Sequence, residues 1–259
     1  MSDEVTAPDL VKLPFETDEG CGPRARLGLI VLQSDQTIEA EARMLDVEGV
    51  EFYHSRIPND VEVTPRTLTD MEQRLPIAAG LLPADFGFDA IGYGCTSAAA
   101  LIGEAKVTAG IRAAHPGVAC SNPITAAVAA FHALEARRIA VLTPYTADVT
   151  AAIAEHFADA GLSVTALGSF LEPSDLIVAR ISEASIAAGV RAVASAESDA
   201  VFVSCTSLRV LKTVSDIEDE AGIPVVSSNM ALFWHLLRLA GANVELDGHG
   251  QIFKRQILL

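Results

Sequence analysis

The sequence predicts an α/β fold made of two similar halves, and three observations lead to this prediction. Short, continuous apolar runs alternate with longer Ala- and Leu-rich stretches along most of the chain. Half of the 259 residues are hydrophobic, which is enough to fill a large core. Segments that lie about 110 residues apart resemble one another. Alternating strands and helices with buried strands are typical of a parallel sheet that helices cover on both faces.

The strands are expected at short runs of three to six mostly apolar residues, because such runs are typical of strands buried in a parallel sheet. These runs are residues 27–32, 90–93, 139–142, 164–167, 200–203 and 224–226. The helices are expected at residues 38–45, 126–134, 149–160 and 181–195. The predicted organisation is an acidic N-terminal lead-in (1–24), two α/β halves (25–135 and 136–241) and a C-terminal tail (242–259).

An internal repeat supports the two halves. The stretch from Asp89 to Ser97 aligns with the stretch from Asp199 to Ser207, and Asp, Ala, Cys, Thr and Ser are identical in the two. At the same offset, the strand that ends at Leu32 aligns with the one that ends at Leu142, and Asp35 aligns with Tyr145. Residues 118–122 resemble residues 225–229. A duplicated unit explains matches that share one order and nearly one spacing.

The charge balance excludes several classes of partner. The formal net charge is −16. Nucleic-acid binding and docking on anionic membranes both need a basic surface, so neither is expected. No apolar stretch approaches the length of a membrane span, and the first twenty residues are acidic without the pattern of a signal peptide. We therefore expect a cytoplasmic protein with reduced thiols.

The two Cys-Thr-Ser triplets are the candidate catalytic groups. Cys95 and Cys205 each follow a predicted strand, and ligands bind at the carboxyl ends of strands in open α/β sheets. We expect a helix to begin after each cysteine and its positive end to stabilise a thiolate. Two such strand ends, related by a pseudo-twofold axis, would face one cleft, where one thiol acts as base or nucleophile and the other as acid.

The other candidate residues surround these thiols. Hydroxyls and backbone amides can bind a carboxylate or an enolate, and the hydroxyl residues in question are Thr96, Ser97, Thr206 and Ser207. Gln33, Ser34 and Asp35 follow the first strand, and Tyr145 follows the corresponding strand of the second half. Asp35 is either a helix N-cap or a substrate contact, and Tyr145 either covers the sheet edge or faces the substrate.

Several kinds of chemistry have no signal in the sequence. Cys21 and Cys120 are interpreted as inert thiols, and a disulfide between Cys95 and Cys205 stays open if the cleft is narrow. The four cysteines and six histidines show no metal-ligand spacing. No phosphate-binding or dinucleotide-binding glycine motif is present. We therefore expect no metal and no organic cofactor.

The chain resembles the aspartate/glutamate racemase superfamily from about Arg26 to Gly241. The similarity rests on residues 94–97, 143–145, 204–209 and 224–229 and on Trp234-His235. Within that superfamily it is most similar to the branch of maleate cis-trans isomerases, arylmalonate decarboxylases and ectoine-utilisation racemase-like proteins. Residues 53–58 and 227–229 look most like the ectoine-utilisation group.

This resemblance implies a mechanism. In maleate isomerases, the cysteine that matches Cys95 adds to the double bond as a thiolate, the bond rotates, and the thiolate leaves. The cysteine that matches Cys205 is the acid partner, and the tyrosine that matches Tyr145 contacts the substrate carboxylate. The family also implies a homodimer or larger assembly. Decarboxylases of this branch keep one cysteine, so the presence of both disfavours that activity.

One position departs from the family pattern. Asp35 stands where the maleate isomerases have a substrate-binding Asn, so an anion replaces an amide. A substrate with an ammonium group would suit this change, which favours racemisation of an amino acid such as an ectoine-derived diaminobutyrate. Three functions thus remain open: a cofactor-independent cis-trans isomerase of a small carboxylate, an amino-acid racemase, and a non-catalytic small-acid-binding protein.

Overall fold

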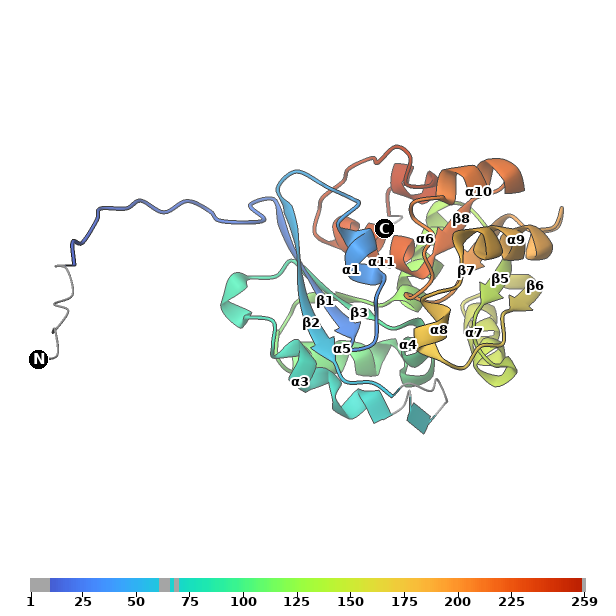
Figure 1. The fold of residues 1–259 in the computed structure, drawn as a ribbon, viewed down its shortest axis with the longest axis horizontal. Coiled ribbons are helices and arrows are strands. Elements are labelled where there is room, and N and C mark those ends of the chain that lie inside the picture. The colour runs from blue at the N-terminus through green and yellow to red at the C-terminus, as the bar shows by residue number, and fades with distance from the viewer. Residues whose placement is uncertain (1–9, 61–65, 68–69, 258–259) are drawn as a thin grey trace, which may run out of the picture.

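The computed structural model describes residues 10–60, 66–67 and 70–257, and its described strands form two parallel four-stranded sheets (Figure 1). The first sheet has the order β2-β1-β3-β4, from β1 (Ala25–Leu32), β2 (Val50–Ile57), β3 (Ala90–Gly94) and β4 (Ala119–Ser121). The second has the order β6-β5-β7-β8, from β5 (Arg138–Thr143), β6 (Ser163–Ser169), β7 (Ala200–Val203) and β8 (Val225–Ser227). The strand order is therefore the same in both sheets, and the predicted α/β fold of two similar halves is confirmed.

The helices connect and cover these strands. In the first half they are α1 (Ile38–Ala42), η1 (Asp70–Gln73), α3 (Leu75–Ala79), η2 (Ala84–Phe86), α4 (Thr96–Ile102), α5 (Glu104–Arg112) and α6 (Pro123–Ala133). In the second half they are α7 (Ala147–Asp159), α8 (Asp175–Val178), α9 (Glu183–Val193), α10 (Val214–Ala221), α11 (Ser228–Leu239) and η3 (Gln251–Lys254). The helices predicted at 126–134, 149–160 and 181–195 are confirmed as α6, α7 and α9.

Two local predictions differ from the structure. The helix that begins at Ile38 ends at Ala42, three residues before the predicted end. Strand β2 was not predicted, because it lies at the edge of the sheet and six of its eight residues are partly or fully exposed. Its polar residues interrupt the apolar run that marks a buried strand.

A shared core joins the two sheets. Phe131 of α6 lies edge-to-face on Phe202 of β7, with 6.1 Å between ring centroids, and Phe52 of β2 packs on Phe233 of α11 at 5.6 Å. Helix α11 also covers β3: a Cβ added at Gly92 would lie 2.9 Å from the Leu236 side chain, so a larger residue there would force that side chain to move. Helices of each half thus pack against the sheet of the other, and the carboxyl ends of the strands meet at the boundary.

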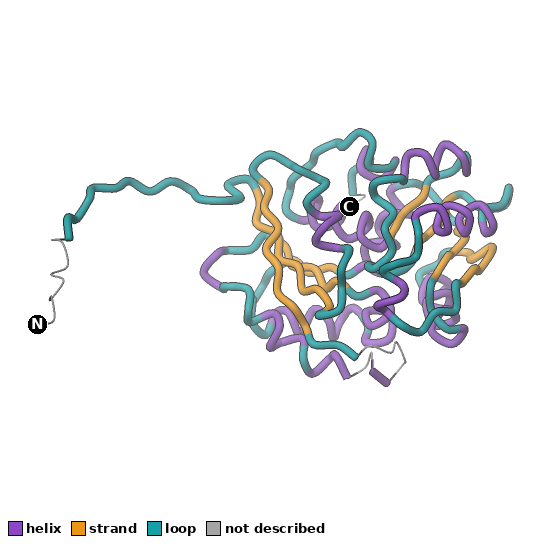
Figure 2. The backbone as a smooth tube through the Cα atoms, viewed as in Figure 1, coloured by secondary structure: helices purple, strands orange, loops and turns teal. Residues whose placement is uncertain are grey.

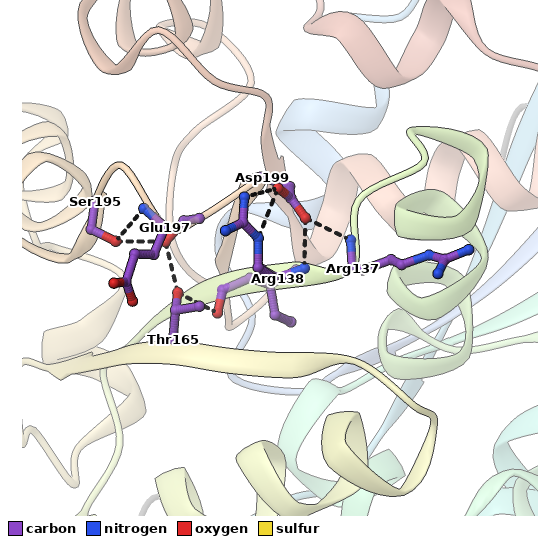
Figure 3. Close-up of polar contacts among 8 residues, drawn as sticks. Arg137, Arg138, Thr165, Ser195, Glu197 and Asp199 are labelled. Carbon is purple, nitrogen blue, oxygen red and sulfur yellow. Dashed lines mark hydrogen bonds and ion pairs between the residues drawn. The ribbon is translucent and has the colours of Figure 1, made fainter.

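The matched Asp residues of the repeat have a structural role at the amino ends of the strands. Asp89 Oδ2 accepts a hydrogen bond from the Arg26 amide at 2.9 Å. Asp199 Oδ2 accepts one from the Arg138 amide at 2.8 Å, and its Oδ1 forms an ion pair with the Arg138 guanidinium (Figure 3). This guanidinium, with backbone amides, lowers the pKa of Asp199 to about 2. The two aspartates fasten β1 to β3 and β5 to β7 at the ends opposite the cysteines.

The two terminal segments differ in how they contact the rest of the protein. The described part of the N-terminal lead-in runs away from the body as an extended segment (Figure 2). Residues 242–257 instead pack on α11, because the buried Arg238 side chain donates to four carbonyls of this segment, those of Ala242, Val244, Phe253 and Arg255. Residues 1–9 and 258–259 lie outside the described residues. No helix of the described chain has the length and apolar character that a membrane span needs.

Candidate active site

Cys95 lies between β3 and α4, as predicted. It is the N-cap of α4, with an extended backbone (φ −144°), and its side chain is buried. The Ser97 hydroxyl lies 3.8 Å from its Sγ. Burial raises the pKa of the Cys95 thiol to about 11, against smaller lowering effects from the Ala98 amide and the hydroxyls of Ser97 and Tyr93. The helix start therefore limits the increase without producing the lowered pKa that the sequence analysis expected.

Cys205 has a different environment. It follows β7, but no helix begins there: residues 205–213 form turns, and α10 begins at Val214. Its φ is +109°, a strained conformation for a residue with a side chain. Burial and, next, the negative charge of Asp175 raise the pKa of its thiol well above the ordinary range. Hydrogen bonds from the Tyr145 hydroxyl and the Ser207 amide, the latter at 3.4 Å, offset part of this increase.

Ser228 joins the two triplets at the boundary between the halves. Its Oγ accepts a hydrogen bond from the Thr96 hydroxyl at 2.8 Å and another from the Cys205 amide at 2.9 Å. Ser228 is the first residue of α11 and is fully buried. The Thr206 hydroxyl also points across the boundary, 3.5 Å from the Gly94 carbonyl. Rotation of one cysteine segment relative to the other would break these bonds.

Both thiols line one cleft, which encloses about 400 Å³ including its open mouth. The residues around it are Leu32, Asn59, Asp60, Thr67, Met71, Cys95, Thr96, Ser97, Tyr145, Asp175, Cys205 and Thr206. Six predicted site residues are thus brought together: Cys95, Thr96, Ser97, Tyr145, Cys205 and Thr206. Both cysteines are free thiols, and no disulfide joins them.

Of the four remaining predicted residues, Ser34 and Ser207 lie just behind the lining. Ser207 Oγ donates to Asp175 Oδ1 at 3.0 Å, and Ser34 Oγ donates a short bond to Asp175 Oδ2. Gln33 has an exposed side chain and is not among the residues that line the cleft. The structure therefore gives Gln33 no contact with this site.

Of the two roles considered for Asp35, the structure shows that of a helix N-cap, and the substrate contact stays a prediction. Its Oδ1 accepts hydrogen bonds from the amides of Thr37 and Ile38, at 2.7 and 2.8 Å, and so caps the start of α1. Its Oδ2 is buried without a well-formed hydrogen bond. Burial raises the pKa of Asp35 to about 6, and the charge of Asp175 adds to this increase. The Thr206 hydroxyl opposes part of this increase, and Asp35 itself is not among the residues that line the cleft.

Asp175 is the functional residue that the sequence analysis missed. It begins α8, it is 4% exposed, and it carries the one carboxylate of the described lining that is this deeply buried. It belongs to no motif, and α8 has four residues, so the sequence contains no signal for it. A carboxyl at this place sets the charge of the cleft, because its effect reaches both thiols.

Glu41 and Asn229 support the segment after Cys205. Glu41 Oε1 accepts hydrogen bonds from the amides of Val210 and Leu211, at 2.7 and 2.8 Å. Asn229 Nδ2 donates to Glu41 Oε2 at 2.7 Å and to the Thr206 carbonyl at 2.8 Å. The turns that follow Cys205 are thus held by a buried network from α1 and α11, in place of the helix that follows Cys95.

The remaining candidates have structural surroundings. Cys21 is exposed and Cys120 is half-buried, and neither lines the cleft. His235 stacks on Trp234, and its Nδ1 lies 2.8 Å from the Ser121 hydroxyl. Burial lowers the pKa of His235 to about 4, so the ring is neutral near pH 7. The interpretation of this histidine as a packing residue agrees with these contacts.

The fold and the cleft together define a class: α/β proteins with two similar halves, each of which contributes one cysteine to a shared site. Residues 27–253 match the family model described as arylmalonate decarboxylase, and the chain belongs to this family.

The relatives with known activities include both an arylmalonate decarboxylase and a maleate isomerase. The chain is 34% identical to an arylmalonate decarboxylase of Bordetella bronchiseptica over 153 residues, which cover 58% of this chain and 63% of that protein. It is 27% identical to a maleate isomerase of Geobacillus stearothermophilus over 245 residues, or 88% of this chain and 96% of that protein. These relatives are enzymes, and the prediction of a maleate isomerase-like enzyme is confirmed.

The fold is also that of a solved maleate isomerase. The structure of a cysteine-to-serine mutant of the Nocardia farcinica maleate cis-trans isomerase, with a covalently bound succinylcysteine intermediate, has a TM-score of 0.81 to this chain. The match covers 88% of this chain and 98% of that one at 24% identity, a comparison that bears on the fold.

Proposed function

We propose that this protein is a cofactor-independent isomerase that uses Cys95 and Cys205 on a small carboxylate substrate, as a maleate isomerase does. One observation carries the proposal: equivalent cysteines from the two halves line the same buried cleft. Two thiols that face one ligand can exchange a proton or form and break a bond at a carbon next to a carboxylate. The family membership and the isomerase relatives support this choice.

The surroundings of the two thiols favour different roles. Cys95 receives the amides of a helix start and two hydroxyls, and its pKa is raised less than that of Cys205. We therefore assign Cys95 as the thiolate that attacks and Cys205 as the thiol that donates a proton. A buried pair of this kind titrates jointly, and a substrate that displaces water sets the final protonation states.

For a cis-trans isomerisation, the Cys95 thiolate would add to one carbon of the double bond. The C–S bond forms, the π electrons move to the neighbouring carbon, and the adjacent carboxylate delocalises the charge. Cys205 can protonate that carbon to give a succinyl-type thioether and take the proton back after rotation about the single bond. Expulsion of the Cys95 thiolate then restores the double bond in the trans form, so atoms and electrons balance.

The racemase is the second candidate, and the carboxyl of Asp35 favours it. For a racemisation, one thiolate would remove the α-proton of an amino acid and the other thiol would return a proton to the opposite face. An anion beside the cleft suits a substrate that carries an ammonium group. An ectoine-derived diaminobutyrate is one such amino acid.

Proton NMR in D₂O separates these reactions. Purified protein would be incubated with maleate, aspartate, glutamate, 2,4-diaminobutyrate and its acetyl derivatives. Fumarate would demonstrate cis-trans isomerisation, and loss of an α-proton signal would demonstrate racemisation. Either activity should disappear in both Cys95→Ser and Cys205→Ser.

The chain offers matched controls for these variants. Cys21→Ser and Cys120→Ser remove thiols that lie outside the cleft, so both should keep full activity. A reaction that survives in Cys95→Ser or Cys205→Ser would overturn the proposal. The absence of thiol-dependent turnover with every compound of this panel would also overturn the proposal. The non-catalytic binding protein would then be preferred.

Two further expectations accompany the function. A reducing compartment such as the cytoplasm would keep both thiols free, as the reaction requires. The homodimer or larger assembly remains a prediction, and analytical ultracentrifugation would measure it.

A further inference from the structure

The charge of the cleft is unusual for a site that takes a small carboxylate. Asp175 and Asp60 are the charged residues of its lining, and no lysine or arginine is among the described residues there. Asp60 lies at the mouth, where Arg74 forms an ion pair with it at 3.6 Å. Asp175 has no such partner: the ion pairs found among the described residues do not include it.

The hydrogen bonds of Asp175 come from hydroxyl groups. Each oxygen accepts one hydroxyl, from Ser34 on one side and from Ser207 on the other. Such bonds orient the group without neutralising it. A buried carboxylate without a cation is costly unless a ligand supplies the opposite charge.

Asp35 is a second buried carboxyl group whose charge acts on this site. Its Oδ2 is buried and lacks a well-formed hydrogen bond, although its Oδ1 accepts two. Asp35 and Asp175 interact with each other and with Cys205 through their charges. Two carboxyl groups thus lie near the reacting thiols, and the one that lines the cleft, Asp175, has hydroxyl partners but no cation.

A dianionic substrate does not fit this arrangement. Each carboxylate of a dicarboxylate would meet hydroxyls and backbone amides at Thr96 and Ser97, but no cation among the described lining residues. The charge of Asp175 would oppose it across a cleft of low dielectric constant. A substrate with both a carboxylate and an ammonium group would place the first on these donors and the second beside Asp175.

We propose that Asp175 binds the ammonium group of the substrate and restricts this enzyme to small amino-substituted carboxylates. The inference rests on the proposed function of the cysteine pair, because it names the substrate class of the same cleft. Asp175 is thus the specificity-determining residue, and the hydroxyls of Ser34 and Ser207 hold it in place.

Binding measurements test this inference without turnover. Isothermal titration calorimetry would compare ligands that differ in one ammonium group: aspartate with succinate, and 2-aminobutyrate with butyrate. The wild-type protein should prefer the amino member of each pair by roughly 30-fold or more, the usual effect of one buried charge partner. In Asp175→Asn this preference should fall to about threefold or less, on the same reasoning.

An increase in succinate affinity would distinguish a change in ligand recognition from a disruption of the cleft. Asp175→Asn should bind succinate more tightly than the wild type does, because the repulsion is removed, whereas a disrupted cleft would weaken every ligand. Asp216→Asn is the matched control, since it removes one charge from an exposed position of α10. It should leave both preferences unchanged.

The outcomes are distinct. Equal affinity of the wild type for both members of each pair, or an unchanged preference in Asp175→Asn, would overturn the inference and leave the cysteine chemistry standing. Loss of thiol-dependent turnover on all carboxylates would remove the proposed function. An ammonium preference that depends on Asp175 would persist in that case, so the two failures can be told apart.

Discussion

The two Cys-Thr-Ser segments have the same sequence and different conformations. Cys95 caps a helix with a relaxed backbone, whereas Cys205 stands at a φ of +109° in a turn that Glu41 and Asn229 support. A duplicated triplet has thus produced one thiol with helix amides and hydroxyls around it and one beside the charge of Asp175. A duplicated segment can thus keep its reacting sulfur atom while the residues around that atom give it a different role.

The largest expected effect is the loss of either thiol. Cys95→Ser should lower kcat/KM by about 10⁴-fold or more, because the attacking group is lost. Cys205→Ser should lower it by roughly 10²–10⁴-fold, the usual effect of one general acid. Measured turnover of the identified substrate would check both values. A larger loss in Cys205→Ser than in Cys95→Ser would contradict the assigned difference in roles.

Alkylation measures the difference between the thiols directly. In a Cys21→Ser, Cys120→Ser background, iodoacetamide should modify Cys95 before Cys205, with a rate ratio on the order of 10², because more of Cys95 is ionised at any given pH. The rate at Cys95 should rise with pH up to about 11, the pKa of its thiol. Peptide mass spectrometry at several times would give both rates. Faster modification of Cys205 would reverse the assignment.

Asp35 and Tyr145 occupy corresponding positions in the two halves. Of the two side chains, the buried carboxyl of Asp35 should lower the free energy of unfolding. The pKa of Asp35 is about 6 in the folded chain against 3.8 for a free group, so the folded state binds its proton more tightly. Its contribution to stability is therefore present below about pH 4 and is lost as the pH rises through about 6. Asp35→Asn should raise the unfolding free energy at pH 7 by about 3 kcal/mol and change little at pH 4.

Urea denaturation at pH 4, 5, 6 and 7 would follow this change. The amide oxygen of Asn can still cap α1, so helix α1 should persist in the variant. A gain in stability that stays constant over this pH range would show that ionisation of Asp35 is not the cause.

The smallest expected effect compares two matched serines. Ser228→Ala removes the acceptor that the Cys205 amide and the Thr96 hydroxyl share, and should cost about 1–2 kcal/mol of stability and part of the activity. Ser121, its counterpart in the repeat, contacts His235 and no cysteine. Ser121→Ala should therefore affect stability alone. Urea denaturation and kcat/KM would be measured for both, and a loss of activity in Ser121→Ala would contradict the comparison.

The sequence predicted the fold well because its main signals are local. The central strands are continuous apolar runs, and β7 (Ala200–Val203) was predicted with its observed bounds. The edge strand β2 was missed because its side chains are largely exposed and polar. The identical triplets suggested identical helix starts, but the segment after Cys205 is shaped by Glu41, which lies 169 residues before the Val210 amide that it binds.

The site was predicted in part for the same reason. Both cysteines were identified because they recur at one offset in the repeat, and Tyr145 because it aligns with Asp35 at the same offset. Asp175 has neither a motif nor a described counterpart, and its place beside the thiols depends on hydrogen bonds to Ser34 and Ser207, 141 and 32 residues away. Contacts of this range follow from the packing of the whole chain, which no local pattern reports.

The shared core has a consequence for how the protein can be divided. Phe131 belongs to the first half by sequence and fills space beside Phe202 of the second, while α11 of the second half covers β3 of the first. A fragment that contained only one half would expose apolar surface that is buried in the intact chain. We therefore expect neither half to be stable alone, so that the two thiols come together only in the intact chain.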